Sequence, residues 1–198
     1  MRDYENSTEP ELIRWAKQGD VDAFSRLYAG IYKDLYRFAL YTVRHRQDAE
    51  DAVSEAVAAA WENIGQLRKE ESFRAWIFTI LNNCCRKILR RQRKDVGSLT
   101  DSIQQGSAQG NGSGVQELAG SVRKHADGAR GYADQDYAEK LDVREAFGAL
   151  EEEERMILAF SVFGGYRSEE IGAIMEKNAA TVRSRKSRAL EKMRRMLT

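Results

Sequence analysis

Apolar residues recur at steps of three and four along most of the chain, which is the spacing of one face of an α-helix. The pattern is clearest in a segment that ends near Arg44, where one face carries Phe24, Leu27, Tyr28, Ile31, Leu35, Phe38 and Ala39. The chain has only one proline, and no alternating run of Val, Ile and Thr is bounded by turn residues. We therefore predict an all-α protein.

Helix start and stop signals divide the first part of the chain into four expected helices. Thr8 and Glu11 form the S/T-x-x-E pattern of a capping box, with Pro10 in the first turn. The expected helices run from this box to Gly19, from an Asp20 cap to about Arg44, from Asp48 to Gly65, and from a Ser72 cap through Phe73 to about Arg93.

The middle of the chain has a different composition. Eight of the 15 glycines lie between residues 95 and 138, together with Ser, Gln and Asn and few large apolar residues. Such a segment buries too little apolar surface to order itself, so we predict a flexible linker. Two small helical domains are expected on either side of it, at residues 8–94 and 139–198. In the second domain the helical pattern runs from Leu141 to Val162 and is followed by helices at about Ser168 to Met175 and Ala179 to Leu197.

Charge is nearly balanced overall but is separated along the sequence. The chain has 32 Lys and Arg against 31 Asp and Glu, a formal net charge of +1. Residues 68–94 hold nine basic residues against two acidic ones, and residues 177–198 hold eight against one, so each segment has a net charge of +7. The chain therefore has two candidate surfaces for a polyanion.

The last basic segment has the pattern of a helix-turn-helix. A short helix from Ser168 is followed by a tight link at 176–178, and Asn178 can cap the next helix. In this motif the second helix enters the major groove of duplex DNA, where Arg pairs with guanine and Ser or Thr contacts either base of a pair. The polar side of this helix supplies the candidate readers Thr181, Arg183, Ser184, Ser187 and Arg188. A basic amphipathic helix with a merely solvated face is the simpler alternative.

The fourth expected helix combines other side chains. The face opposite Trp76 and Ile80 presents hydroxyl, amide and guanidinium groups, and aromatic rings stand at its margin. These groups suit single-stranded nucleic acid, because rings stack on bases, amides read unpaired edges and arginines hold phosphates. The candidates are Thr79, Asn82, Arg86, Arg90 and Arg93, with Arg74, Phe78 and Asn83 at the margins. A solvated helix end explains the arginines equally well.

The third expected helix carries an acidic line opposite its apolar face, formed by Asp48, Asp51, Glu55 and Glu62. Such a line repels DNA and suits a basic protein surface, although an ordinary solvent-facing side explains it as well.

Several function classes are excluded by what the sequence lacks. His45 and His125 stand far apart, and the adjacent Cys84 and Cys85 form neither a disulfide framework nor a metal-ligand spacing. No Ser/His/Asp set or phosphate-binding glycine loop is present, so we predict no enzyme activity, no metal and no cofactor. The first residues lack the pattern of a secretory signal, and no apolar run reaches a membrane span. We expect a cytoplasmic protein without membrane insertion.

Three stretches resemble the extracytoplasmic-function (ECF) group of bacterial RNA polymerase sigma factors, the reduced type of the sigma-70 family with regions 2 and 4 only. Residues 48–55, DAEDAVSE, followed by Trp61, resemble the DAED-x-x-Q-E-x-F segment, with Ser54 in place of glutamine. Residues 72–83, SFRAWIFTILNN, resemble S-F-x-x-W-L-x-x-I-A-x-N. SEEIG at 168–172 with TVRSR at 181–185 resembles S-x-x-E-I-A and T-V-K/R-S-R.

The resemblance implies a function for each candidate surface. The acidic helix would bind the clamp of core RNA polymerase, and the carboxy-terminal helix-turn-helix would read the minus-thirty-five promoter element and touch the polymerase flap. The minus-ten element would be recognised and opened by Arg68, Lys69, Arg74, Phe78, Thr79, Asn82, Asn83, Arg86 and Arg90. Members are commonly held inactive by an anti-sigma factor, which is thereby a candidate partner.

Two other binding functions remain open. One is a helix-turn-helix transcriptional regulator that binds duplex DNA without being a polymerase subunit. The other is an RNA-binding adaptor that uses the fourth helix. The regulator leaves the face of Thr79, Asn82 and Arg86 unexplained, and a preference for RNA over promoter DNA would favour the adaptor.

Overall fold

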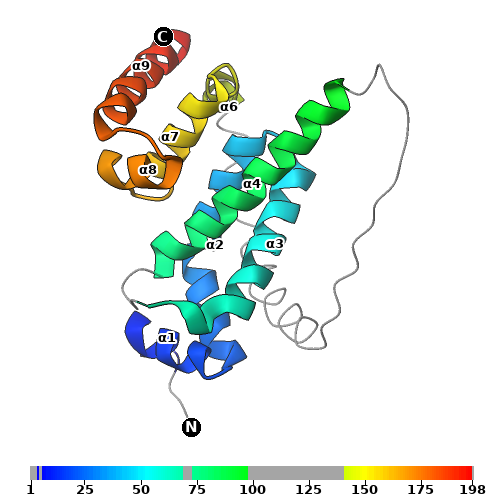
Figure 1. Ribbon diagram of the computed structural model, residues 1–198, viewed down its shortest axis with the longest axis vertical. Coiled ribbons are helices and arrows are strands. Elements are labelled where there is room, and N and C mark those ends of the chain that lie inside the picture. Colours follow the sequence, from blue (N-terminus) through cyan, green and yellow to red (C-terminus); the bar gives the residue numbers. More distant parts are fainter. Residues whose placement is uncertain (1–3, 5, 69–72, 98–140, 198) are drawn as a thin grey trace.

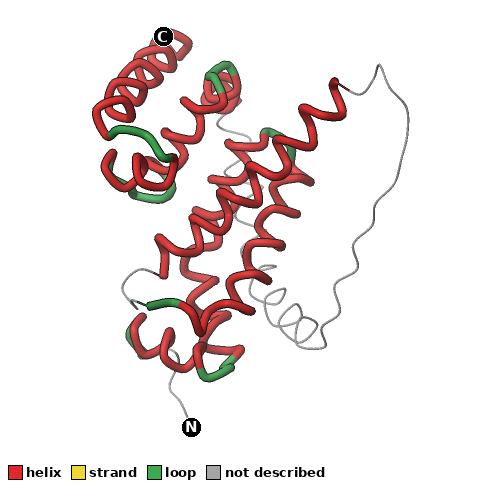
Figure 2. Tube along the Cα trace, in the orientation of Figure 1, coloured by secondary structure: helices red, strands yellow, loops and turns green. Residues whose placement is uncertain are grey.

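The computed structural model describes residues 4, 6–68, 73–97 and 141–197, and within these ranges the chain is helical and contains no strand (Figure 2). The predicted all-α class is therefore confirmed. The helices are α1 (Glu9–Lys17), α2 (Val21–Val43), α3 (Arg46–Asn63), a 3-10 turn (Ile64–Gln66), α4 (Phe73–Gly97), α6 (Leu141–Gly148), α7 (Glu152–Val162), α8 (Ser168–Met175) and α9 (Ala179–Leu197). Nearly all of the predicted linker, and the predicted cap Ser72, lie outside the described residues.

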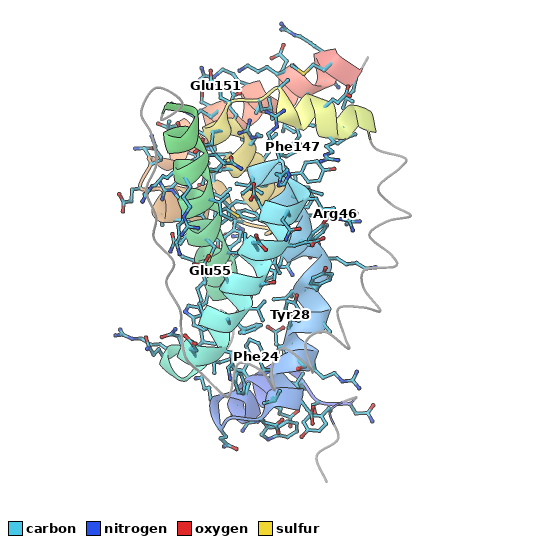
Figure 3. The ribbon with its side chains drawn as sticks, turned by 90° about the vertical axis from the view of Figure 1, so that its right-hand side faces the viewer. Phe24, Tyr28, Arg46, Glu55, Phe147 and Glu151 are labelled. Atoms are coloured by element: carbon cyan, nitrogen blue, oxygen red, sulfur yellow. The ribbon has the colours of Figure 1, made fainter. Side chains whose placement is uncertain are left out.

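The amino-terminal half is a bundle of three long helices, α2, α3 and α4, with α1 across one end (Figure 1). Phe24 of α2 lies at that end, and its ring centroid is 5.2 Å from Trp61 of α3 and 6.2 Å from Phe73 of α4. Figure 3 shows Phe24 among these helices. Edge-to-face aromatic pairs of this kind add to the burial of apolar surface that holds the bundle together.

Most helix ends follow the sequence signals. The Glu11 carboxylate accepts a hydrogen bond from the Thr8 backbone N–H at 2.9 Å, and the Asp20 carboxylate accepts one from the Ala23 N–H at 3.0 Å. The expected start of α3 at Asp48 is two residues late. His45 is the N-cap, with its Nδ1 accepting from the Asp48 N–H at 3.5 Å, so α3 begins at Arg46. At its other end α4 extends to Gly97, four residues beyond the expected end at Arg93.

In the described residues, the carboxy-terminal half is built from three short helices, α6, α7 and α8, and the longer α9. The expectation of a single helical run from Leu141 to Val162 was wrong, because the chain breaks between α6 and α7. Leu150 at this break is buried, and its carbonyl oxygen accepts a hydrogen bond of 2.6 Å from the Arg155 guanidinium. The Glu154 carboxylate accepts from the Glu151 backbone N–H at 3.3 Å and closes the first turn of α7. The apolar periodicity of the sequence continues across residues 149–151, so it does not show that the helix ends there.

The two halves pack against each other, and the larger of two buried hydrophobic clusters contains residues of both halves. Phe38 of α2 lies 4.8 Å from Phe160 of α7 between ring centroids, and Tyr41 of α2 lies 4.8 Å from Phe147 of α6. Phe38 and Phe160 are completely buried. No helix in the described ranges is long and apolar enough to cross a membrane.

Candidate nucleic-acid interface

The predicted helix-turn-helix is formed by α8 and α9. Glu176, in the left-handed conformation with φ 55°, ends α8, and the Lys177 N–H bonds to the Gly172 carbonyl at 2.8 Å. A Cβ at Gly172 would lie only 2.6 Å from the Lys177 carbonyl oxygen, so the turn is too tight there for a side chain. The Asn178 side chain accepts from the Ala180 N–H at 2.8 Å, as its predicted capping role requires.

The outer face of α9 is open to solvent. Val182 and Ala189 are fully buried against the other helices, which turns the opposite side outward. The five predicted readers, Thr181, Arg183, Ser184, Ser187 and Arg188, are all exposed. Arg188 Nη2 donates to Ser184 Oγ at 3.2 Å, so these two side chains already lie next to each other on the outer face.

Acidic residues hold several of the basic side chains of this half. Arg183 Nη1 lies 2.6 Å from Glu169 of α8, Lys177 Nζ lies 3.1 Å from Glu153 of α7, and Arg185 also pairs with Glu153. The net charge of +7 counted along residues 177–198 therefore overstates the charge that this surface offers to DNA. Arg188 instead bonds to the Ser184 hydroxyl on the outer face.

Glu154 ties α7 to α9 from a buried position. Lys192 Nζ donates to its two carboxylate oxygens at 2.8 and 2.9 Å. Burial raises the pKa of Glu154, but the bonds from Lys192 and from the Glu151 N–H outweigh that effect and leave the pKa below the usual value for glutamate. The carboxylate therefore stays charged and fixes the second helix of the motif.

The predicted face on α4 is only partly exposed, and this corrects the sequence-based picture. Asn82 and Phe78 are buried, with 1% and 0% of their surface exposed. The reason is that α4 packs against both α3 and α2, so its buried stripe is wider than the one containing Ile77 and Cys84. Within the described residues the Asn82 Oδ1 atom has no hydrogen-bond partner. Thr79 is half-buried, and its hydroxyl donates to the Ala75 carbonyl at 2.9 Å.

The remaining α4 candidates lie nearer the surface. Arg68, Asn83 and Arg90 are exposed and Arg86 is half-buried, whereas Lys69 lies outside the described residues. Arg74 is half-buried, and its Nη2 atom lies 2.7 Å from the Asp34 carboxylate. Its guanidinium carbon stands 5.2 Å from the centre of the Phe78 ring. Guanidinium groups thus follow α4 over several turns.

The acidic line on α3 is present, but its members differ in their surroundings. Lys87 of α4 lies 2.6 Å from Glu55, and Gln92 of α4 donates to Asp48 at 2.7 Å. Figure 3 shows Glu55 on the side of α3 next to α4. Asp51, which accepts from Gln47 at 3.3 Å, and Glu62 are exposed. The outward acidic surface is therefore centred on Asp51 and Glu62.

The adjacent cysteines are buried in the bundle and are not linked to each other. Burial, and secondarily the Glu55 carboxylate, raise the pKa of Cys84 to about 11, and burial also raises that of Cys85. Both thiols are therefore protonated at neutral pH and poor nucleophiles.

Sequence reasoning missed the residues that form ion pairs with the predicted site residues. Asp34 bonds to Arg74 across 40 positions, Lys87 bonds to Glu55 across 32, and Arg183 bonds to Glu169 across 14. Charge alone does not identify such partners, because each pair depends on how the helices cross. The Gly164-Gly165 pair before the buried Tyr166 is a local signal of a sharp corner, since Gly165 has φ +73°.

Each half of the chain matches a model of a known protein family. The family model "Sigma-70 region 2" matches residues 27–95 and "Sigma-70, region 4" matches residues 140–193, together more than half of the chain. RNA polymerase sigma factor SigV of Bacillus subtilis is 26% identical over 166 residues, covering 84% of this chain and 86% of that protein. The ECF RNA polymerase sigma-E factor of Escherichia coli K12 is 27% identical over 192 residues, covering 94% and 93%.

Two solved structures have the same fold. One is the sigma factor RpoE in complex with the anti-sigma factor NepR from Bartonella quintana, with a TM-score of 0.62 and 21% identity over 88% of this chain and 96% of that one. The other is CnrH in complex with the cytosolic domain of CnrY, with a TM-score of 0.60 and 20% identity over 96% of both chains. With the two family matches in this order, the chain belongs to the ECF group of sigma-70 RNA polymerase sigma factors, which direct promoter recognition.

Proposed function

We propose that this sigma factor divides promoter recognition among three surfaces, each assigned to particular residues. The outer face of α9 reads the minus-thirty-five element as duplex DNA through Thr181, Arg183, Ser184, Ser187 and Arg188. The exposed side of α4 and the segment before it bind the opened minus-ten strand. The acidic side of α3 binds core polymerase. We place this activity in the cytoplasm.

The observation that carries the proposal is the separation of charge on α9. Arg185 of α9 and Lys177 of the preceding turn are held by Glu153, and Arg183 pairs with Glu169. Arg188 instead bonds to Ser184, on an exposed face that also carries Thr181 and Ser187. Short hydroxyl side chains beside an arginine suit base edges in the major groove, because the hydroxyls accept or donate and the guanidinium pairs with guanine. A helix that was merely solvated would have no need for this sorting.

For α4, the proposal rests on the exposed or half-exposed members of the predicted set. Arg68, Asn83, Arg86 and Arg90 supply phosphate contacts and one amide for an unpaired base. Asn82 is not part of this proposal, since its amide is buried in the bundle. Phe78 is likewise buried, and Arg74 is half-buried and paired with Asp34, so neither is part of this proposal.

For polymerase binding, the proposal rests on Asp51 and Glu62. These residues are eleven positions apart, which brings both to the same face of α3 after about three turns of 3.6 residues. Both are exposed, and an acidic face of this kind is complementary to a basic protein surface. We also propose an anti-sigma factor as a partner, by analogy with the two solved complexes of similar fold.

The decisive experiment is run-off transcription from fragmented genomic DNA, with core polymerase in the presence and absence of the chain. We expect new transcripts only when the chain is present, and their start sites would define the promoters. Asp51→Lys with Glu62→Lys should reduce polymerase affinity and transcript yield at least tenfold. Asp22→Lys, a charge reversal at an exposed site on α2, is the control. Duplex binding without any polymerase-dependent transcript would instead favour the stand-alone regulator.

A further inference from the structure

A pocket lies where the end of α2 meets α6. Its volume is about 230 Å³, and its walls come from the last turn of each helix. A cavity of about 150 Å³ holds benzene, so this pocket has room for one aromatic ring with a small polar group. Figure 3 shows Phe147 of α6 at this junction, and its ring centroid lies 4.8 Å from that of Tyr41. These two rings and Leu40 form the apolar part of the wall.

The polar part of the wall is mainly basic. Arg44 and Arg144 line the pocket together with one carboxylate, that of Glu145. A third guanidinium lies behind the wall, because Arg155 Nη1 donates to the Gly148 carbonyl at 3.5 Å. Burial lowers the pKa of Arg155 and the charge of Arg44 lowers it further, so these two guanidiniums are close enough to repel each other. An anion in the pocket would offset this repulsion.

Two features place the Arg44 guanidinium at the pocket. Arg44 ends α2 in the left-handed conformation with φ 66°, which is uncommon for residues other than glycine, asparagine and aspartate. Gly148 leaves space for the guanidinium on the α6 side, since a Cβ there would lie 2.9 Å from Arg44 Nη2. In the part of the chain that the structure describes, this guanidinium forms no ion pair. Its N–H groups are therefore available to a ligand.

Arg155 satisfies the end of α6, so Arg44 is not needed there. Besides its bond to Gly148, Arg155 Nη1 donates to the Leu150 carbonyl at 2.6 Å, and both carbonyls lie at or just after the last turn of α6. Arg155 is only 8% exposed, and among the described residues its Nε has no hydrogen-bond partner. A buried donor normally has a partner. The basic groups at this junction thus exceed what the neighbouring helices use.

We propose that this pocket binds a small organic anion that carries an aromatic ring, with its anionic group on Arg44 and Arg144 and its ring against Leu40, Tyr41 and Phe147. Guanidinium groups suit a phosphate or a carboxylate, because their N–H groups can bond two oxygens at once. The site gives the sigma factor a means of responding to a small molecule, and it does not depend on the promoter contacts assigned above. A ligand that binds only the folded chain also stabilises it.

The test is isothermal titration calorimetry of the full chain at neutral pH with phenyl phosphate as the probe. Inorganic phosphate supplies the anion without the ring, and benzyl alcohol supplies the ring without the anion. We expect a Kd on the order of 0.1–1 mM for phenyl phosphate and binding at least roughly tenfold weaker for the other two compounds. At about ten times its Kd, phenyl phosphate should raise the Tm of the chain by about 3–6 °C.

Two variants of the wall test the location of the site. Arg44→Asn removes the guanidinium and keeps a residue that tolerates the left-handed conformation. Gly148→Ala places a Cβ against Arg44 Nη2, and the flexible side chain can move away without a change of the backbone. We expect Arg44→Asn to weaken phenyl phosphate binding at least roughly tenfold, as for the loss of a charged hydrogen bond. Gly148→Ala should weaken it by a smaller factor.

Two matched controls make the same changes away from the pocket. Gly30→Ala adds a Cβ on the exposed side of α2, where no atom lies within 4 Å of it. Arg46→Asn removes an exposed guanidinium from the first turn of α3. Both should leave the Kd for phenyl phosphate unchanged. Circular dichroism of every variant verifies that the chain is folded.

Three results would overturn the proposal. The first is no heat of binding and no change in Tm with phenyl phosphate above the expected Kd range. The second is inorganic phosphate that binds as tightly as phenyl phosphate, because the ring would then have no place in the site. The third is binding that Arg44→Asn and Gly148→Ala both retain, since the probe would then lie on another basic surface. Polymerase-dependent transcription is measured separately, so none of these results affects the proposed function.

Discussion

Arg188 is the arginine of α9 from which the largest effect on base recognition is expected. Its guanidinium bonds to the Ser184 hydroxyl, whereas those of Arg183 and Arg185 bond to carboxylates. We predict that Arg188→Ala weakens binding at one duplex base position by about 1–3 kcal/mol and relaxes preference there. The measurement is affinity for single-base variants of a mapped promoter. Arg185→Ala, the control, should reduce stability through its pair with Glu153 rather than change preference. Equal preference before and after the Arg188 change would remove this residue from the reading face.

Glu154 makes the stability of the carboxy-terminal half depend on pH. Its pKa in the folded chain is below the usual value for glutamate, so its contribution is complete above that usual value and is lost as the pH falls through the folded pKa. Glu154→Gln should cost about 1 kcal/mol at pH 7, a figure that allows for the solvent exposure of Lys192. Urea unfolding should show that the difference in free energy of unfolding between the unmodified chain and Glu154→Gln becomes smaller below pH 4.5. Glu191→Gln, at an exposed pair with Arg195, is the control. If that difference stayed constant down to acid pH, the Glu154 charge would not be the source of the stabilisation.

At the scale of the element, the helix-turn-helix depends on the absence of a side chain at Gly172. Because a Cβ there would lie 2.6 Å from the Lys177 carbonyl, Gly172→Ala must push α8 away from the turn that leads into α9. We predict a loss of about 1–3 kcal/mol in stability, as for other overpacked sites, together with weaker duplex binding. Calorimetry and binding to a mapped promoter measure the two effects. Ala173→Gly in the same helix is a useful comparison, since that position is exposed and should lose only the helix propensity of alanine. If Gly172→Ala changed neither stability nor duplex binding, the turn between α8 and α9 would be able to shift without cost.

The helices themselves show how far the sequence was informative. Thr8, Asp20 and Asn178 act within three residues of their own position, so the helix starts that they mark could be predicted from local chemistry. The reading face of α9 could also be predicted, because one side of that helix is apolar and packs inward. The face of α4 was not, since α2 and α3 bury two sides of one helix and hide Phe78 and Asn82 among them. Periodicity identifies an apolar stripe on a helix, but it does not show how many other helices will pack against that helix.

At the scale of the whole molecule, the shared core couples the stability of the two halves. Phe160 of the carboxy-terminal half packs on Phe38 of the amino-terminal half, and both are completely buried. The three tryptophans of the chain, at positions 15, 61 and 76, all lie in the amino-terminal half, so their fluorescence reports the unfolding of that half alone. Phe160→Leu leaves part of this shared space empty. It should therefore destabilise the tryptophan-bearing half as well as its own.

We predict that Phe160→Leu lowers the tryptophan-reported Tm by roughly 2–8 °C, for a loss of about 1–2 kcal/mol in a chain of this size. The helical signal at 222 nm should fall at the same temperature. Met193→Ala is the control, because Met193 belongs to a second buried cluster whose buried members all lie in the carboxy-terminal half. If the halves unfolded independently, both variants would leave the tryptophan transition where it was. A common transition would instead mean that the two halves unfold as one cooperative unit, because the packing of Phe160 on Phe38 couples their stability.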